Sequence, residues 1–428
     1  MTNDKQQTTN NKQQIYQEFL TAAAGGVEDY PKLMYMGVET SPYQEAIKDY
    51  ASYLQLKPDG KNLVSGITAD ATFSPYPQIG QVPEIDEQGL KFLAPDITEA
   101  CICISNLVEG QIQTKWLGRN ALGNDEFWST SKILPILNLV SRLNTNYPNI
   151  DLKNCSIRGQ DQLGVNQGYP FFDLVRDVVS YEERIATSNS LGVMFKQFST
   201  QREITDWVKS ITGNHNLMFL GGYGEKPFIE QPELIDHATQ QIVLTSTAPT
   251  HRGDNSISAY DLTRMISMVG WHEHLPETSR LPGVQWPNLE GIVRALGTDP
   301  ARYLDLAITK LGLPEVIDYP VIISKLGNGA TKVRNRTEAV YVALVQLVVR
   351  NRVSSKDDNE ISASFSKKPG FWTEQPARLI SFSMAIKGAK QLESRDLDQE
   401  VVELDAIMAT EVTEILRRTV MGELRIEN

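Results

Sequence analysis

The sequence predicts an α+β protein: one antiparallel sheet flanked by terminal helices, with an inserted all-helical domain. Three observations predict this class. Strand-like runs occur early and late in the chain, amphipathic helical segments fill the middle, and one long helical segment closes the chain. Because a sheet and a helix must each bury an apolar face, the simplest packing joins the early and late strands in one sheet under the last helix and sets the middle apart.

The domain boundaries follow from that packing. We expect residues 96–135 and 318–428 to form the sheet domain, residues 136–317 the helical domain, and residues 1–95 an N-terminal extension. About the first 14 residues are polar and rich in Gln and Asn, so we expect them to be disordered. Further along, the extension has a helical pattern in YQEAIKDYASYLQL.

The strands and helices are predicted from the periodicity of apolar residues. ACICISNLVEGQIQTKWLG alternates, breaks at Glu109-Gly110 and resumes, which predicts a β-hairpin. Late strands are expected in YPVIISKLGNG, TEAVYVALVQLVV and ARLISFSMAIKG, with the charged loop SSKDDNE between the last two, and DQEVVELDAIMATEVTEILRRTVM predicts the closing helix. The middle has amphipathic helical patterns in LVRDVVSYEERIA, SLGVMFKQF, ITDWVKSI, SAYDLTRMISMVGW and PARYLDLAITKLGL, and QQIVLTST as a candidate strand.

Composition narrows the classes of function. A net charge of −12 over 428 residues argues against a protein that coats nucleic acid or an anionic membrane, and no apolar run is long enough to span a bilayer. Cys101, Cys103 and Cys155 cannot form a disulfide framework, and the first two are expected to be buried on one side of a strand. The N-terminus lacks the basic and apolar segments of a signal peptide. We therefore expect a cytoplasmic protein, or one of the cell envelope if a signal was removed.

The stretch FWSTSKILPIL, residues 127–137, places Ser129 three positions before Lys132. Serine is a preferred helix N-cap, so capping is one interpretation, and a second S-x-x-K pair, Ser364 and Lys367, lies in a polar loop. On a helix, however, Lys132 can reach the Ser129 hydroxyl, and a lysine whose pKa is lowered can act as the base that a serine nucleophile needs. A helix N-terminus also favours a developing oxyanion, and this combination suits acyl transfer.

Two further stretches fit the same chemistry. Thr187-Ser188-Asn189 begins a helical pattern, and Lys325-Leu326-Gly327 ends a predicted strand and is followed by NGATKVR. The alternatives are that the hydroxyl and amide of the first stretch cap a helix, and that Lys325 is an edge-strand charge. Asn328-Gly329 is also an ordinary turn signal, and Arg334 could be a solvated surface charge.

The order S-x-x-K, hydroxyl-x-Asn and K-x-G resembles the penicillin-recognising serine enzymes, the family of serine β-lactamases and DD-peptidases. It is most similar to the class A β-lactamases over roughly residues 97–428. KLGNGATKVR parallels their K-(S/T)-G segment and reaches Arg334, and DNSISAYDLTRMI resembles the helix after their Ω-loop. The resemblance implies a β-lactamase/transpeptidase-like fold and an enzyme that needs no metal or cofactor.

The resemblance also implies roles for residues in catalysis. Ser129 would be the acylated nucleophile and Lys132 its activator. Thr187, where the family usually has serine, would relay a proton to the leaving group. Asn189 would hold Lys132 and the substrate amide, and Lys325 would supply positive potential beside the relay hydroxyl.

Further implied roles concern the substrate and water. The backbone N–H groups of Ser129 and Asn328 would form the oxyanion hole. Gly327 and Arg334 would contact the substrate, and Arg334 would bind a carboxylate group of that substrate. Glu230 and Glu233, in PFIEQPELIDHATQ, are the possible deacylation bases, and the alternative is that both are surface charges.

One residue departs from the family pattern. Leu326 replaces the hydroxyl residue between Lys and Gly, so β-lactam binding is in question. Two other signals, His272-Glu273-His274 on a presumed strand and GGYG at 221–224, are interpreted as structural.

Two classes of function remain after the sequence analysis. The first is a serine acyl hydrolase that cleaves an amide or ester, either a β-lactam or a peptide-like molecule. A variant of this class is a cytoplasmic esterase or amidase with an unrelated substrate. The second is a binding or scaffold protein that kept the fold and lost turnover. The expected partner is a small-molecule or peptide-like substrate, and the sequence does not predict the oligomeric state.

Overall fold

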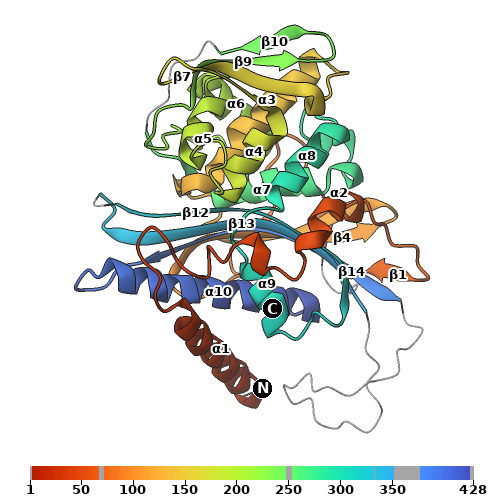
Figure 1. Ribbon diagram of the computed structural model, residues 1–428. Helices are drawn as coiled ribbons and strands as arrows, with labels where there is room; N and C mark the ends of the chain where they lie inside the picture. The colour runs from red at the N-terminus through yellow and green to blue at the C-terminus, as the bar shows by residue number, and fades with distance from the viewer. Residues whose placement is uncertain (1, 67–71, 247–252, 332, 351–375, 425–428) are drawn as a thin grey trace.

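A large sheet separates two layers of helices in the computed structural model, which describes residues 2–66, 72–246, 253–331, 333–350 and 376–424 (Figure 1). The chain is thus an α+β protein, as the sequence predicts. The charged loop SSKDDNE and the second S-x-x-K pair, Ser364 and Lys367, lie outside the described residues.

The main sheet joins strands from both ends of the chain. Its order is β12-β13-β14-β4-β5-β2, and every pair along this path is antiparallel. The late strands therefore pair with the early hairpin through β14 and β4, which confirms the predicted arrangement. The strands are β4 (Ile97–Val108), β5 (Gln111–Arg119), β12 (Ile317–Thr331), β13 (Arg336–Val349) and β14 (Ala377–Lys390), with short additions β1 (Leu63–Ser65), β2 (Ser74–Pro75) and β3 (Ile85–Asp86).

The predicted hairpin is confirmed at its turn. Glu109 and Gly110 have φ values of 49° and 79°, the left-handed conformations that a two-residue turn matched to strand twist requires. Cys101 and Cys103 are buried in β4, as expected from their spacing.

One face of the sheet is covered by α10 (Leu397–Met421) and α9 (Tyr303–Lys310), and α1 (Thr2–Ala23) packs against α10 on the same side (Figure 1). The expected closing helix is confirmed as α10. The extension differs from expectation at its start, because α1 includes the segment predicted to be disordered. The reason is tertiary contact: α1 packs on α10, and Lys12 forms a 2.7 Å ion pair with the buried Glu411.

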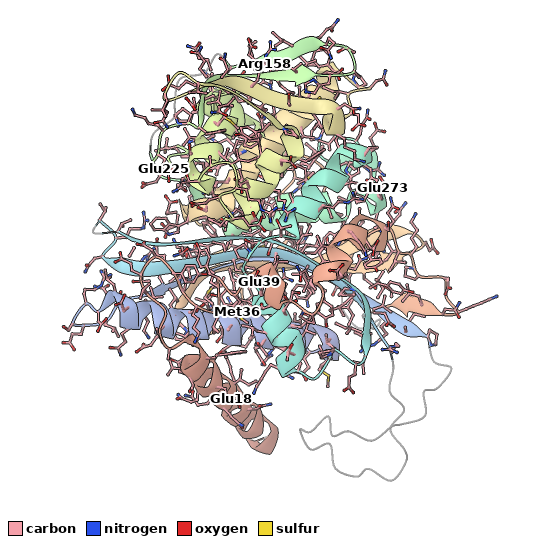
Figure 2. All side chains as sticks on the ribbon, in the orientation of Figure 1. Glu18, Met36, Glu39, Arg158, Glu225 and Glu273 are labelled. Carbon is pink, nitrogen blue, oxygen red and sulfur yellow. The ribbon has the colours of Figure 1, made fainter. Side chains whose placement is uncertain are left out.

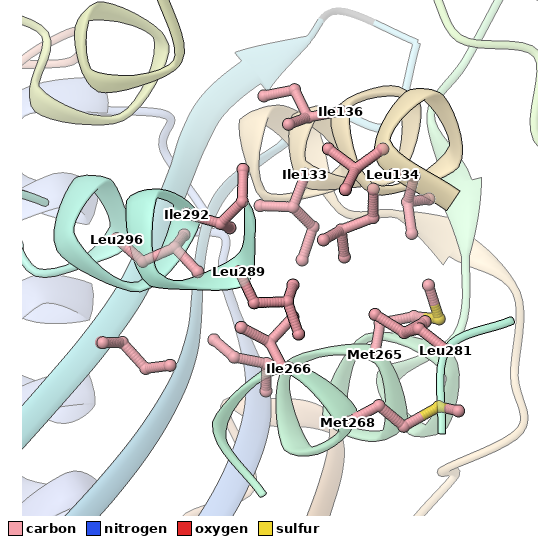
Figure 3. Close-up of a cluster of buried hydrophobic side chains, with 14 of the residues drawn as sticks. Ile133, Leu134, Ile136, Met265, Ile266, Met268, Leu281, Leu289, Ile292 and Leu296 are labelled. Carbon is pink, nitrogen blue, oxygen red and sulfur yellow. The ribbon is translucent and has the colours of Figure 1, made fainter. Parts of the chain in front are cut away.

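The other face carries the inserted region. Its core lies between α3 (Ile133–Asn146), α7 (Ala259–Gly270) and α8 (Trp286–Leu296), whose apolar side chains meet in Figure 3. The remaining helices are α2 (Tyr50–Tyr53), α4 (Phe171–Ser180), α5 (Ser188–Lys196) and α6 (Gln201–Thr212), and short 3₁₀ segments include η1 (Val38–Thr40), η2 (Gln44–Asp49), η3 (Trp128–Lys132), η4 (Leu152–Asn154), η5 (His272–His274) and η6 (Glu277–Ser279).

The inserted region is not all-helical, which corrects the expectation. It contains a four-stranded sheet of order β10-β9-β7-β8, and β10 corresponds to the candidate strand QQIVLTST. The other strands are short and largely polar, so their apolar periodicity is too weak to predict them. These strands are β7 (Cys155–Asp161), β8 (Asn166–Pro170), β9 (Ile229–Asp236) and β10 (Gln241–Thr245), and a separate pair joins β6 (Asp125–Glu126) to β11 (Ser256–Ile257). The proposed domain boundaries stay a prediction.

None of the helices in the described part of the chain is both long and apolar enough to cross a membrane.

A buried arginine ties the N-terminal extension to the inserted region. Arg264 on α7 is fully buried, and its guanidinium donates to the carbonyl oxygens of Pro77 (3.2 Å), Gln78 (2.6 Å) and Gln81. It also donates to the Tyr260 hydroxyl at 2.7 Å. These carbonyls belong to a segment without regular structure, so Arg264 supplies the donors that a helix or sheet would otherwise provide.

We predict that Arg264→Met destabilises the protein by about 3–5 kcal/mol, because buried carbonyl groups lose their donors. Denaturant unfolding measures the change. Arg202→Met is the matched control, because Arg202 lies on α6 with its side chain 91% exposed, and we expect its effect to stay within about 0.5 kcal/mol. An Arg264→Met variant as stable as this control would contradict the assigned role.

Candidate active site

The predicted nucleophile lies in a pocket of about 380 Å³. Its walls come from η3, the start of α5, the end of β12, the loop before β9 and the loop after β10. Pockets of this size are typical of small-molecule sites. The described residues lining it are Glu126, Trp128, Ser129, Asn189, Gly222, Tyr223, Gly224, Gly253, Asp254, Asn255, Asn328, Thr331, Val333 and Arg334.

Ser129 lies in the tight turn η3 rather than at the cap of a regular helix. Neither η3 nor α3 has a side-chain cap hydrogen bond, so the capping interpretation of Ser129 does not hold. The turn is held against β12 because position 327 is glycine: a Cβ there would lie 2.9 Å from the Ser129 backbone nitrogen. Gly327 is thus buried beneath the nucleophile and does not line the pocket.

Lys132 is fully buried behind Ser129. Its ammonium donates to Ser188 Oγ at 2.9 Å and to Asn189 Oδ1 at 2.7 Å. Burial lowers the pKa of Lys132 well below its ordinary value, and the positive charges of Lys325 and Lys196 lower it further. A buried lysine whose pKa is lowered in this way is suited to accept a proton.

Lys325 is the second buried lysine of the site, and its partner is a tyrosine that the sequence analysis missed. Lys325 Nζ lies 2.6 Å from the Tyr181 hydroxyl and donates to the Leu326 carbonyl at 3.1 Å. The Tyr181 side chain also forms a hydrogen bond with Ser129. The Tyr181 hydroxyl therefore links Ser129 to Lys325. The resemblance implies a relay hydroxyl at this position.

Tyr181 is suited to relay a proton and not to act as a base. Burial raises the pKa of Tyr181 well above its ordinary value, so the phenol keeps its proton. The residue follows α4 in a left-handed conformation, with φ of 56°. No sequence pattern predicts that conformation for a tyrosine in a polar loop, which explains why this residue was missed.

Thr187 does not occupy the relay position, contrary to the expectation. It is the N-cap of α5, accepts a hydrogen bond from the Ser190 backbone at 3.1 Å and donates to the carboxylate of Glu225. Within the described residues it has no hydrogen bond with Ser129 or Lys325. The N-cap geometry turns its side chain back over its own helix, so the next residue, Ser188, contacts Lys132 instead. Asn189 holds Lys132, as expected.

The substrate side of the pocket contains Arg334 and Asn328. Arg334 Nε pairs with the buried Glu338 at 3.0 Å, and its guanidinium lies 5.2 Å from the Trp128 ring centre. The Trp128 indole donates to the same carboxylate at 2.9 Å. Arg334 is thus held on the pocket wall and is not a solvated surface charge.

Leu326 points away from this pocket. It belongs to the apolar core on the α10 side of the sheet, with Leu404 and Met408. The strand therefore offers no hydroxyl to substrate at this position.

Glu230 and Glu233 are not in the site, which corrects their assignment as possible deacylation bases. Both lie on β9 in the small sheet, where Glu233 pairs with Arg158 at 3.2 Å. Figure 2 labels Arg158 at the end of the inserted region farthest from the main sheet. The surface-charge interpretation holds for both. The pocket wall has carboxylates of its own, Glu126 and Asp254, and burial raises the pKa of Glu126.

The GGYG segment, interpreted as structural, reaches the site. Gly222, Tyr223 and Gly224 line the pocket, and the Tyr223 ring centre lies 5.2 Å from Lys132 Nζ. The His272-Glu273-His274 segment forms η5 and not a strand, and His274 Nε2 is bonded to the Leu54 carbonyl. Among the described residues, no group of three His, Cys, Asp or Glu side chains is placed to hold a metal ion.

A third buried lysine lies behind Tyr223. Lys196 is 1% exposed, its Nζ lies 4.6 Å from the Tyr223 ring centre, and among the described residues this nitrogen has no hydrogen-bond partner. Burial lowers the pKa of Lys196 to about 7. The site thus groups three buried lysines around Tyr181 and Tyr223.

Comparisons with known proteins give a weak likeness to one group of structures. No family model matches the sequence, and no curated protein matches it. An extended-spectrum β-lactamase structure has 10% identity and a TM-score of 0.41, over 77% of this chain and 97% of that chain. A class A β-lactamase from Bacteroides cellulosilyticus has 9% identity and a TM-score of 0.37, over 74% and 92%. A putative class A β-lactamase from Rhodopseudomonas palustris has 12% identity and a TM-score of 0.36, over 74% and 94%. Likenesses this distant say nothing about the chemistry of this chain.

We predict that Lys196→Met stabilises the protein at and below about pH 7, by on the order of a few kcal/mol, because it removes an unpaired buried cation. The folded-state pKa of about 7 lies below the ordinary lysine value of 10.5. The unfolded chain therefore binds more protons between these pH values, and wild-type stability rises with pH across them. The advantage of the variant should accordingly shrink toward pH 10.5.

Denaturant unfolding from pH 6 to pH 10 measures this difference. Lys226→Met is the matched control, because Lys226 is exposed on the loop after Tyr223. A Lys196→Met variant that is less stable than wild type at pH 6, or whose difference does not change with pH, would contradict the assignment.

Proposed function

We propose that this protein is a serine acyl hydrolase that forms an acyl-enzyme on Ser129. The observation that carries the proposal is the buried Lys132, three residues after Ser129, whose pKa is lowered and whose side chain Ser188 and Asn189 hold. A water-excluded lysine without a carboxylate partner costs folding free energy, and a general base is the role that such a group suits.

In this proposal the reaction has two steps. Lys132 takes the Ser129 proton, Ser129 Oγ attacks the substrate carbonyl carbon, and the oxyanion is stabilised by the backbone N–H groups of Ser129 and Asn328. The proton then passes from Lys132 through the Tyr181 hydroxyl to the leaving nitrogen or oxygen, and the bond to the leaving group breaks. Glu126 then takes a proton from water as the water oxygen attacks the carbonyl carbon of the ester. The bond from that carbon to Ser129 Oγ breaks, the acid leaves, and the proton passes from Glu126 to the Ser129 oxygen.

The substrate is an amide or ester with a nearby carboxylate, either a β-lactam or a peptide-like molecule. Arg334 on the pocket wall supports the carboxylate, because its guanidinium presents several donors in one plane. Lys325 adds positive potential next to the reacting atoms. Leu326, which gives no hydroxyl, argues for a substrate other than a penicillin.

The alternative is a binding protein of the same fold without turnover. Two observations favour it: Leu326 faces the core, and the expected bases Glu230 and Glu233 lie on the far sheet. A binding protein has no need for a buried lysine of lowered pKa three residues after Ser129, so reactivity of this serine separates the two.

Intact-protein mass after incubation with a fluorophosphonate probe tests the proposal. We predict one adduct on the wild type, none on Ser129→Ala, and labelling at least about 100-fold slower in Lys132→Met, which keeps most of the unbranched stem of the side chain and removes the base. If the wild type were not labelled, the hydrolase proposal would be rejected in favour of the binding protein. The same measurement with a penicillin then reports whether β-lactams are substrates.

A second prediction concerns the relay. We expect Tyr181→Phe to slow labelling of Ser129 by about tenfold or more, equivalent to the loss of one hydrogen bond of about 1.4 kcal/mol at the reacting hydroxyl. Thr187→Val is the matched comparison, because it removes the hydroxyl that the resemblance assigns, and we expect it to label within about twofold of wild type. If Thr187→Val labelled more slowly than Tyr181→Phe, the relay hydroxyl would instead be that of Thr187.

A further inference from the structure

The N-terminal extension passes beside the active site on its way across the sheet. Figure 1 shows α1 on the α10 side of the main sheet and α2 on the opposite side, so the chain between them crosses the sheet at the edge strand β12. Figure 2 labels Met36 and Glu39 on this stretch. Nothing in the proposed reaction so far uses residues of this segment.

The crossing segment is anchored by a buried carboxylate. The backbone N–H groups of Leu33 and Met34 donate to Asp405 of α10, at 2.6 Å and 3.1 Å. The Tyr303 hydroxyl donates to the same group at 2.5 Å. Leu33 and Met34 are themselves buried. The backbone on the N-terminal side of Tyr35 is therefore fixed to the core of the sheet domain.

Tyr35 extends from this anchored backbone to two residues of the site. Its hydroxyl donates to Asn328 Oδ1 at 2.8 Å, and its ring packs edge-on against Tyr181 with ring centres 5.8 Å apart. On its other side, Tyr30 stacks on it at 4.8 Å. Asn328 lines the pocket, and Tyr181 contacts Ser129, so one side chain of the extension touches both the pocket wall and the relay.

We propose that Tyr35 is a positioning residue for the reaction at Ser129, and that the N-terminal extension is therefore part of the active site. Its hydroxyl holds the Asn328 carboxamide and, through it, the stretch of β12 that carries the proposed oxyanion donor. Its ring packs edge-on against Tyr181 and fixes the orientation of that side chain. This inference rests on the proposed function, because the rate of reaction at Ser129 is what it predicts.

The test compares labelling rates with a fluorophosphonate probe on the full-length chain. Tyr35→Phe removes the bond to Asn328 and keeps the ring, so we expect labelling about three- to tenfold slower than wild type. Tyr35→Leu also removes the ring contact with Tyr181, and we expect a further loss of about three- to tenfold. Tyr53→Phe is the matched control, since its hydroxyl belongs to the same extension and only reaches Asp49 at 3.5 Å.

A double-mutant cycle separates positioning from general destabilisation. If Tyr35 acts through Asn328, then Tyr35→Phe should change the rate by less than about twofold when Asn328→Ala is already present. The side-chain amide signals of Asn328 in a ¹⁵N-labelled protein should also shift in Tyr35→Phe and not in Tyr53→Phe. Thermal unfolding of each variant verifies that it is folded.

The outcomes distinguish this inference from the proposed function. A wild type that does not label overturns the proposed function, and this inference with it. Two results would overturn the inference alone, provided that the wild type labels. The first is a Tyr35→Phe variant that labels within twofold of the wild-type rate. The second is a Tyr35→Phe substitution that lowers the labelling rate by the same factor in the Asn328→Ala background as in the wild type.

Discussion

The account depends on one constraint: the ammonium group of Lys132 is excluded from water. Burial is the largest cause of its lowered pKa, and two further buried lysines add to the effect. The desolvation cost of Lys132, Lys325 and Lys196 opposes folding, and the cores on the two faces of the sheet must exceed it. Hydroxyl and aromatic groups contact Lys132 and Lys196. Burial lowers the pKa of Lys132 and of Lys325, and the carboxylates of Glu225 and Asp299, respectively, oppose that shift.

The geometry of the pocket depends on how closely the nucleophile's turn approaches the sheet edge. Glycine is needed at position 327 because a Cβ there would lie 2.9 Å from the Ser129 backbone nitrogen, and a Cβ at position 329 would lie 2.4 Å from the Trp128 ring. The turn, the edge strand and Trp128 therefore form one packed unit. The indole of Trp128 and the guanidinium of Arg334 share the buried Glu338, so the positive group on the substrate side is fixed together with the nucleophile.

Much of this could be predicted from the sequence, because apolar periodicity reports burial. The strands of the main sheet, the closing helix, and the residues Ser129, Lys132, Asn189 and Lys325 follow from local patterns. Apart from β10, the strands of the small sheet could not be predicted, since a strand such as NQGYP has no apolar face. The assignment of Thr187 illustrates a second limit: whether a hydroxyl at a helix start points inward or caps the helix depends on a shift of one residue. Tyr181 and Tyr35 are close to Ser129 only through tertiary structure, and no motif includes them.

The central claim is that burial lowers the pKa of Lys132 well below its ordinary value, and this pKa can be measured directly. The ¹³Cε signals of isotopically labelled lysines are followed between pH 5 and pH 11, and the Lys132 signal is assigned by its loss in Lys132→Met. The account predicts that Lys132 titrates well below the ordinary lysine value of 10.5. A Lys132 that titrates together with the exposed lysines would contradict the account, because a protonated ammonium cannot accept the proton of Ser129.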